Sequence, residues 1–378
     1  MSYILKQFDI DLLYFDMQKD IDGVSAQILS VNEEQKNLLP LDLKLSDKGL
    51  AKWLKRRTIP GNRAYVQNFL AKLGLNEKDT KGIIDFCKGL SLNDGYWVVE
   101  ENFTGKFSEN NLYDNRFSNV LSHIAFTGYG SFQKTSLRSS PEFTTNGMLA
   151  KCWRRVDGKI VLYKSGTEGF ANSGNEPYCE YYAYQVAETM GINAVQYGLS
   201  KWKGRLCSTC ELFTSKEYSF MPIGNIVKEG GIKAVIEYYK SLGANYYDAF
   251  ADMIVFDAVI LNTDRHFGNF GFMVDNRTNT ICAPAPLFDH GLSLLTYAMD
   301  DDLQDWEKYA QTRVPATYSD FIELAKQLMG QKQKEKLRKL INFKFKKHPR
   351  YNWSDNRFQI IVRLLQKRVQ LMLDITKN

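Results

Sequence analysis

The stretch NTDRHFGN at 262–269 decides the fold, because it is a short polar loop between two segments of regular structure. The apolar residues before it predict a buried helix over 250–261. Alternating residues after it predict two strands, at 270–274 and 280–283. The hairpin leads into APLFDHG at 285–291, a second loop with an acidic residue. The sequence therefore predicts a helix, a polar loop, a hairpin and an acidic loop, in that order.

Three oxygen-bearing side chains in these loops suit phosphoryl transfer. That reaction needs a carboxylate to position the attacking hydroxyl and oxygen ligands to hold Mg²⁺ on the phosphates. Asp264 and Asn269, five positions apart, would supply the carboxylate and one ligand, and Asp289 would supply the second ligand. Asp and Asn are also common turn residues, but the position of Asp289 after a hairpin favours the metal hypothesis. Asp257, inside the helix, is expected to be a hydrogen-bonded buried group.

A phosphate-binding lysine is expected upstream, at the end of a strand. Lys164 ends the second of two predicted strands, and Glu180 lies on the helix predicted at 177–190, where it could pair with the lysine. Glu176 is the alternative partner, and an exposed strand end is the alternative interpretation of Lys164. The loop TTNGMLAK at 144–151 offers backbone N–H groups that could cover phosphates.

These residues resemble the HipA family of bacterial Ser/Thr kinases, which are the toxins of certain toxin–antitoxin pairs. The resemblance covers about 140–300 well and the helical tail loosely, whereas 1–120 does not match the N-terminal part of the HipA toxin. The polar loop is also similar to that of phosphoinositide kinases. The segments that carry the resemblance are NTDRHFGN at 262–269, APLFDHG at 285–291, LYKSGT at 162–167, EYYAYQVAETMGI at 180–192 and NGMLAK at 146–151.

The resemblance implies a two-lobed, kinase-like α+β fold and a role for each residue named above. Asp264 would be the catalytic base, and Asn269 and Asp289 would hold Mg²⁺. Lys164 would bind the α- and β-phosphates of ATP, and Glu180 would orient it.

The same resemblance implies further nucleotide contacts. Gly147 and Lys151 would belong to the phosphate loop, and the backbone around Glu211 and Phe213 would pair with adenine. His266 would either donate to the γ-phosphate or brace its loop, and bracing is favoured because a histidine in a tight loop often bonds backbone.

Length and composition predict a globular protein of more than one domain. The chain has 378 residues, of which 44% are hydrophobic and 24% charged, and its net charge of +6 fits the handling of an anion without requiring it. We expect an extra α+β module at 1–120 and a sheet with one helix at 121–222. An all-helical lobe, interrupted only by the hairpin near 270–283, is expected at 223–378. Without an apolar leader or a membrane-spanning segment, a cytoplasmic protein is expected.

Two basic segments leave the choice of partner open. The helix pair predicted around 58–62 carries six basic residues between Ser46 and Arg63, and 332–350 has nine Lys or Arg against one Glu. Either segment could bind nucleic acid or an acidic partner, but a solvated helix face is the favoured interpretation of both. The six basic residues of the helix pair are Lys48, Lys52, Lys55, Arg56, Arg57 and Arg63.

The function expected from all this is ATP- and Mg²⁺-dependent phosphorylation of a protein hydroxyl. By the resemblance, the enzyme would be a growth-arresting toxin that modifies a translation component and has an antitoxin or regulatory partner. A non-catalytic nucleotide-binding scaffold and a lipid or small-molecule kinase are the alternatives. The resemblance also makes hydroxyls before Lys151 candidates for phosphorylation, whereas the alternative is that they only shape turns. These hydroxyls belong to Ser139, Ser140, Thr144 and Thr145.

Overall fold

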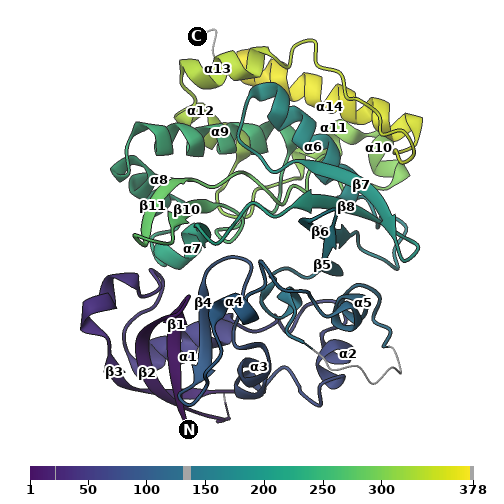
Figure 1. The fold of residues 1–378 in the computed structure, drawn as a ribbon. Coiled ribbons are helices and arrows are strands. Elements are labelled where there is room, and N and C mark those ends of the chain that lie inside the picture. The colour runs from purple at the N-terminus through teal and green to yellow at the C-terminus, as the bar shows by residue number, and fades with distance from the viewer. Residues whose placement is uncertain (22, 131–137, 375–378) are drawn as a thin grey trace. The chain divides into compact units, whose positions relative to one another are not determined.

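The computed structural model describes residues 1–21, 23–130 and 138–374, and the chain divides into two compact units (Figure 1). Helices and sheets occur in both units, which confirms the predicted α+β class. The division of the sequence at 120 and 222 stays a prediction. The first unit is Met1–Lys164, Leu212–Met221 and Met273–Cys282, and the second is Ser165–Glu211, Pro222–Phe272 and Ala283–Asn378.

The first unit begins with an antiparallel sheet in the order β3-β2-β1-β4. Alternation along the second strand buries Leu13, Phe15 and Met17 on one face, which packs against the first helix and its neighbours. The second and third strands pair as an antiparallel hairpin around Gly23. The four strands are β1 (Ser2–Gln7), β2 (Ile10–Gln18), β3 (Ser25–Val31) and β4 (Tyr96–Glu100).

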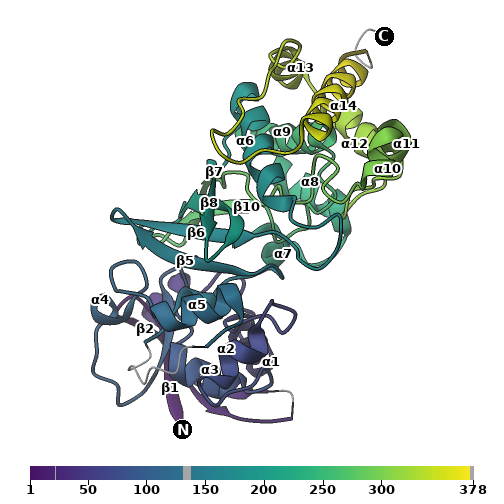
Figure 2. The same cartoon turned by 90° about the vertical axis from the view of Figure 1, so that its right-hand side faces the viewer.

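Helices predicted from the apolar spacing pack beside this sheet (Figure 2). The first begins where the Ser46 hydroxyl accepts a hydrogen bond from the Gly49 amide, and the third begins where the Asp79 carboxylate accepts one from Gly82. Side chains from the second, third and fifth helices share one apolar core. The helical elements of this part are η1 (Glu33–Leu38), α1 (Asp47–Arg56), α2 (Val66–Ala71), α3 (Thr80–Cys87), α4 (Phe107–Asn110), α5 (Asn119–Thr127) and η2 (Pro141–Thr144).

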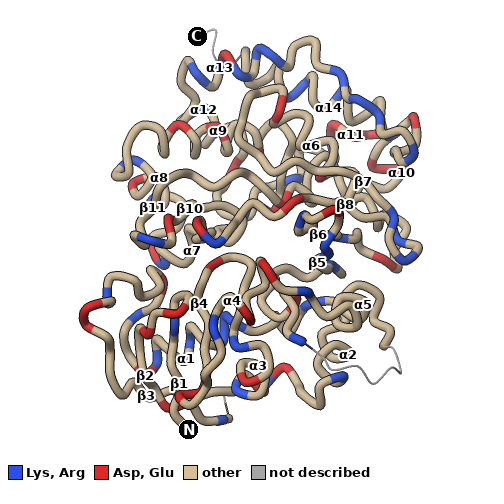
Figure 3. Tube along the Cα trace, viewed as in Figure 1, with Lys and Arg blue, Asp and Glu red and all other residues tan. Residues whose placement is uncertain are grey.

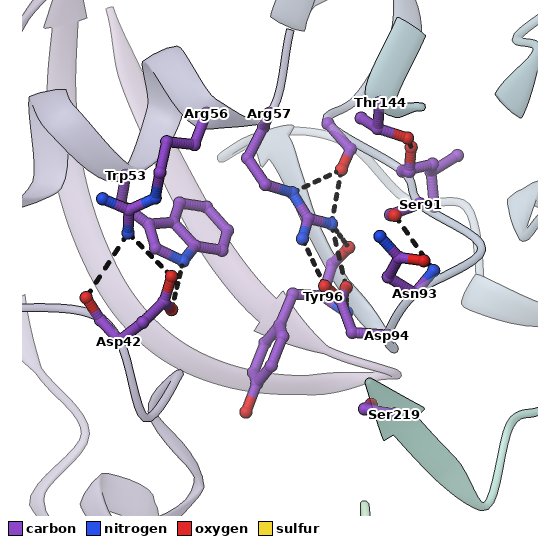
Figure 4. Close-up of polar contacts among 12 residues, drawn as sticks. Asp42, Trp53, Arg56, Arg57, Ser91, Asn93, Asp94, Tyr96, Thr144 and Ser219 are labelled. Atoms are coloured by element: carbon purple, nitrogen blue, oxygen red, sulfur yellow. Dashed lines mark hydrogen bonds and ion pairs between the residues drawn. The ribbon is translucent and has the colours of Figure 1, made fainter. Parts of the chain in front are cut away.

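Arg57, at the end of α1, holds the sheet and helices of this part together (Figure 4). Its guanidinium donates to the carbonyls of Gly89 and Tyr96 at 2.6–2.8 Å and pairs with the Asp94 carboxylate at 2.5 Å. Arg57 is 7% exposed, so it cannot contact a nucleic acid as the basic-helix hypothesis would require.

A hairpin of β5 (Lys151–Val156) and β6 (Lys159–Ser165) follows, with the turn that the sequence predicted at Asp157. The antiparallel register places Lys151 directly opposite Lys164. The first unit also takes in most of a three-stranded sheet in the order β11-β10-β9. Its strands are β9 (Tyr218–Pro222), β10 (Gly271–Asp275) and β11 (Thr280–Pro284).

The second unit is built around two helices. The first is α6, which packs on the hairpin that follows it in the chain and ends where Gly191 takes a positive φ of 72°. The second, α9, is continuously buried from Phe250 to Ile260 and packs against α8 and several later helices (Figures 1 and 2). The elements are α6 (Glu176–Met190), β7 (Tyr197–Trp202), β8 (Arg205–Glu211), α7 (Ile223–Ile226), α8 (Gly231–Ser241), α9 (Ala244–Ile260), α10 (Asp300–Gln304), α11 (Trp306–Gln311), α12 (Phe321–Leu328), α13 (Gln331–Arg338) and α14 (Asp355–Asp374).

The basic segment at 332–350 is partly neutralised by local acids. Lys332 pairs with Asp248 at 2.5 Å and Lys336 pairs with Asp252. The remaining basic residues lie along α13 and the segment after it (Figure 3). Among the described residues, every helix is too short or too polar to cross a lipid bilayer.

Candidate functional site

The polar loop at 262–269 starts where α9 ends. Leu261 has a φ of 53°, which turns the chain out of the helix. The buried side chain of Asn262 then bonds on both sides. Its amide nitrogen donates to Asp257 at 3.0 Å, and its oxygen accepts from the Asp264 amide at 3.2 Å. The start of the loop is thereby fixed to the helix that precedes it.

Asp264, His266 and Asn269 lie in one tight turn. The Asp264 carbonyl accepts from the His266 amide at 2.7 Å and from the Asn269 side-chain nitrogen at 3.2 Å. Because the nitrogen of the Asn269 amide is used in this way, its side-chain oxygen is the atom left to face a cation. His266 is exposed, and its Nδ1 accepts from the Gly268 amide at 3.0 Å. That contact is the geometry of a bracing residue.

A buried arginine, Arg265, holds this loop against the loop that carries Asp289. Its guanidinium binds the Asp257 carboxylate through Nε and Nη2 at 2.8 and 3.0 Å. Its Nη1 donates to the carbonyls of Asn269 and Phe288. Burial opposes the charge of Arg265, but the Asp257 carboxylate raises its pKa above the usual value. Asp257 is thus the hydrogen-bonded buried group that the sequence predicted.

Glu180 and Asp289 meet at the second loop. The Glu180 carboxylate, fully buried on α6, accepts from the His290 amide at 2.8 Å, and Arg265 Nη2 lies 3.0 Å from His290 Nδ1. Asp289 has a φ of 58°, an uncommon conformation for a non-glycine residue, and its amide donates to the Tyr197 hydroxyl at 3.0 Å. Burial, and then Glu180 and Asp289, raise the pKa of Tyr197. Arg265 and Tyr197 therefore position this loop, although the sequence argument assigned neither a role.

Glu176, the alternative to Glu180, has other partners. Its carboxylate accepts from the Tyr297 hydroxyl at 3.0 Å and from the Thr167 amide at 3.2 Å. Burial, and then Glu176, raise the pKa of Tyr297. Of the two glutamates, Glu180 is therefore the one that bonds the loop carrying Asp289.

The residues expected to bind phosphates lie in the first unit, with the exception of Glu180. Lys151 and Lys164 are 5% and 8% exposed, so Lys164 is not the exposed strand-end residue that was its alternative. The Lys151 ammonium donates to the Asn146 carbonyl at 2.7 Å. Gly147 has a φ of 95°, and a Cβ there would lie 2.3 Å from that ammonium nitrogen, so the loop requires glycine.

The two residues expected beside adenine lie at the end of β8 and shortly after it. Glu211 ends β8 and is exposed, whereas Phe213 is half-buried and contacts the ring of Phe220 at 5.6 Å. Two of the hydroxyls considered for phosphorylation are buried. Ser140 donates to Glu142, and Thr144 donates to the Leu90 carbonyl at 3.0 Å. A kinase could reach them only after this part of the chain opens.

The residues present fit Mg²⁺ and ATP in their chemistry. Asn269 and Asp289 offer the oxygen ligands that Mg²⁺ prefers, and Asn269 uses its nitrogen elsewhere. Lys151 and Lys164 lie directly opposite each other in a hairpin, and an ammonium group is a side chain that can bind a phosphate.

The sequence is similar to that of a known bacterial kinase. It is 26% identical, over 142 residues, to the serine/threonine-protein kinase CtkA of Helicobacter pylori strain J99. The match covers 33% of this chain and 43% of CtkA, so it spans less than half the length of that relative. No family model matches the chain.

Two solved structures are similar to this one. The crystal structure of the Helicobacter pylori proinflammatory kinase CtkA matches 61% of this chain and 91% of its own, with 17% identity and a TM-score of 0.49. The HipA of Shewanella oneidensis MR-1, solved with HipB and operator DNA, matches 98% of this chain and 99% of its own, with 12% identity and a TM-score of 0.49. The similarity to a bacterial Ser/Thr kinase, predicted from the motifs, is confirmed by the sequence match to CtkA.

Proposed function

We propose that this protein is an ATP- and Mg²⁺-dependent serine/threonine kinase of the HipA type. Asp264 is the base that accepts the proton of the substrate hydroxyl, and Asn269 and Asp289 hold Mg²⁺. Lys164, with Glu180 as its orienting partner, and the loop with Gly147 bind the phosphates. Lys151 belongs to the same phosphate-binding set, and the backbone around Glu211 and Phe213 takes the adenine.

One observation carries the proposal: Arg265 bonds both loops on which the three oxygen-bearing residues lie. It binds the carbonyl of Asn269 and that of Phe288, and it also contacts His290, so the residues on both sides of Asp289 are tied to the loop of Asp264. If Asp264 and Asn269 only formed a turn, their loop would not need a fully buried ion pair at its centre. Phosphoryl transfer depends on such fixed positions, because catalysis here is mostly positioning and electrostatics.

The test is transfer of labelled phosphate. The full chain is incubated with Mg²⁺, γ-labelled ATP and bacterial lysate, beside the Asp264→Ala variant and a control, Asp248→Ala, whose carboxylate pairs with Lys332 away from the loop. Loss of the base should lower turnover by roughly 10²–10⁴-fold with nucleotide binding largely kept. The control should transfer phosphate as the wild type does.

The labelled product identifies the substrate class. Label on protein serine or threonine supports the proposal, and label on lipid or a small molecule replaces it with the alternative kinase. Binding of ATP without transfer in the wild type would instead support a nucleotide-binding scaffold. Equal transfer by Asp264→Ala would remove Asp264 from the mechanism.

The biological role proposed here is that of a cytoplasmic toxin that acts on a component of translation. The Shewanella HipA was solved with HipB and DNA, and by analogy this chain would have a neutralising partner. Growth is followed after induction of the wild type and of Asp264→Ala in a bacterial host. Arrest by the wild type alone supports the toxin role, and equal growth ends it while leaving the kinase proposal intact.

A further inference from the structure

The segment between α1 and α2 contacts the candidate phosphate loop directly. Arg63 donates from Nη1 to the Thr145 carbonyl at 2.8 Å and from Nη2 to the Lys151 carbonyl at 2.7 Å. The amide of the next residue, Ala64, donates to the Met148 carbonyl at 2.8 Å. Two adjacent residues of the N-terminal part thus bind three carbonyls spread over the whole loop.

The side chain of Arg63 is buried in this contact and does not face solvent. It is 3% exposed, and its Nε is buried without a hydrogen-bond partner among the described residues. Burial lowers its pKa to about 10, a shift that the nearby Glu142 carboxylate opposes, so the guanidinium stays charged at neutral pH. Burying the charged guanidinium costs free energy unless it is hydrogen-bonded. The hydrogen bonds of Nη1 and Nη2 both go to carbonyls of the loop.

The contacts also set the direction of the loop amides. In a trans peptide the carbonyl of one residue and the N–H of the next point to opposite sides. Since the carbonyls of Thr145 and Met148 face Arg63 and Ala64, the N–H groups of Asn146 and Leu149 point away from them. Backbone N–H groups presented together in this way are a common means of binding phosphate.

We propose that Arg63 is a positioning residue for the phosphate loop, so that nucleotide binding depends on the N-terminal part at 1–120, which lies outside the motifs that carry the HipA resemblance. This inference rests on the proposed function. Arg63 touches no nucleotide; it acts by holding the carbonyls of Thr145 and Lys151, which keeps the loop amides outward and Lys151 opposite Lys164.

The experiment compares two buried arginines of the same part in the full chain. Arg63→Gln removes the loop contact, whereas Arg57→Gln removes an equally buried guanidinium that binds the carbonyls of Gly89 and Tyr96 instead. Both variants should be less stable. Only Arg63→Gln should raise the KM for Mg-ATP, by about tenfold, with a smaller change in kcat, because charged hydrogen bonds to the loop are lost. Arg63→Lys, which keeps the charge and can bind one carbonyl, should recover part of the loss.

A second readout needs no nucleotide. Amide hydrogen exchange across 145–151 should become faster in Arg63→Gln and stay unchanged in Arg57→Gln, relative to the overall stability of each variant. Faster exchange in Arg63→Gln alone supports the brace even if the wild type fails to bind Mg-ATP, in which case the proposed function is what fails. Unchanged exchange, or a KM that rises equally in both variants, overturns the inference. If Arg63→Gln does not fold, Arg63→Lys is measured by the same two readouts and decides in the same way.

Discussion

The catalytic-loop candidate at 262–269 and the phosphate-loop candidate at 144–151 each depend on a buried arginine that binds backbone carbonyls. Arg265 belongs to its own loop and is neutralised by Asp257, with which it forms two hydrogen bonds. Arg63 lies about eighty residues before its loop and binds the two carbonyls with no carboxylate hydrogen-bonded to it among the described residues.

The two loops therefore differ in whether the residue that holds their conformation belongs to the loop or to a distant segment. The loop of Asp264 contains its own brace, so its shape follows from a short stretch of sequence and from the helix before it. The loop of Gly147 is held by residues of a different part of the chain. Changes in the N-terminal part can therefore alter the phosphate loop.

The largest effect on the free energy of unfolding is expected from removing Asp257, the carboxylate partner of Arg265. Asp257→Ala leaves the Arg265 charge buried and unpaired, because the two side chains are 0% and 1% exposed. Removing one partner of such a pair costs about 3–5 kcal/mol of unfolding free energy. Urea denaturation followed by circular dichroism measures this loss. Turnover should fall as well, since Arg265, the common partner of Asn269 and His290, loses the carboxylate that holds it.

The exposed pair of Asp248 and Lys332 is the matched control for this prediction. Asp248→Ala should change the unfolding free energy by less than about 1 kcal/mol, because surface ion pairs contribute little. An equally small effect of Asp257→Ala would contradict the view that the loop depends on a buried charge pair.

A smaller effect on the free energy of unfolding is expected from substituting Gly147 in the phosphate-loop candidate at 144–151. Gly147→Ala places a Cβ 2.3 Å from the Lys151 ammonium nitrogen at a φ of 95°, so the lysine or the loop has to move. Gly158→Ala, in the turn of the next hairpin, has a φ of 80° but open space around the new Cβ. Both variants should lose about 1–3 kcal/mol from backbone strain. Only Gly147→Ala should weaken Mg-ATP binding, measured by calorimetry, and similar affinities for the two variants would show that the position of Lys151 does not matter to the nucleotide.

Most elements of the fold could be predicted because local signals determine them. The helix at 47–56 begins at a serine cap, and α6 ends at a glycine that takes a positive φ, as the sequence indicated. The hairpin at 151–165 follows from alternation around an Asp-Gly turn. The strands β1, β4 and β7 were not predicted, and β4 pairs with β1, which lies far from it in the sequence.

In the candidate site, too, residues in local motifs could be predicted and residues in long-range contacts could not. Asp264, Asn269 and Asp289 could be found because they lie in short motifs with fixed spacing. Arg63 was counted among surface basic residues, because nothing in its neighbourhood shows that it is buried against 145–151. Long-range contacts of this kind leave no local pattern, and a buried arginine is uncommon enough that exposure is the natural expectation.

The smallest expected effect concerns the pH dependence of stability near the phosphate loop. Glu142 is fully buried, and burial raises its pKa, which hydrogen bonds from Ser140 and Trp153 and the charge of Arg63 partly oppose. The folded protein therefore holds this proton more tightly than the unfolded chain, whose glutamate has a pKa of about 4.3. The resulting contribution to the unfolding free energy is fully present below the unfolded value and is lost as the pH rises through the folded value.

Glu142→Gln removes this titration, so its unfolding free energy should fall less than that of the wild type as the pH rises from about 4.3 through the raised pKa of the folded state. Arg63→Gln removes a charge that lowers the pKa of Glu142, so the decline should extend to higher pH, whereas Arg57→Gln should leave it where it is in the wild type. Urea denaturation at intervals from pH 4 to 8 measures all four proteins. Parallel curves for the wild type and Glu142→Gln would mean that the folded state does not hold the Glu142 proton, and identical curves for the two arginine variants would mean that Arg63 and Glu142 are not coupled.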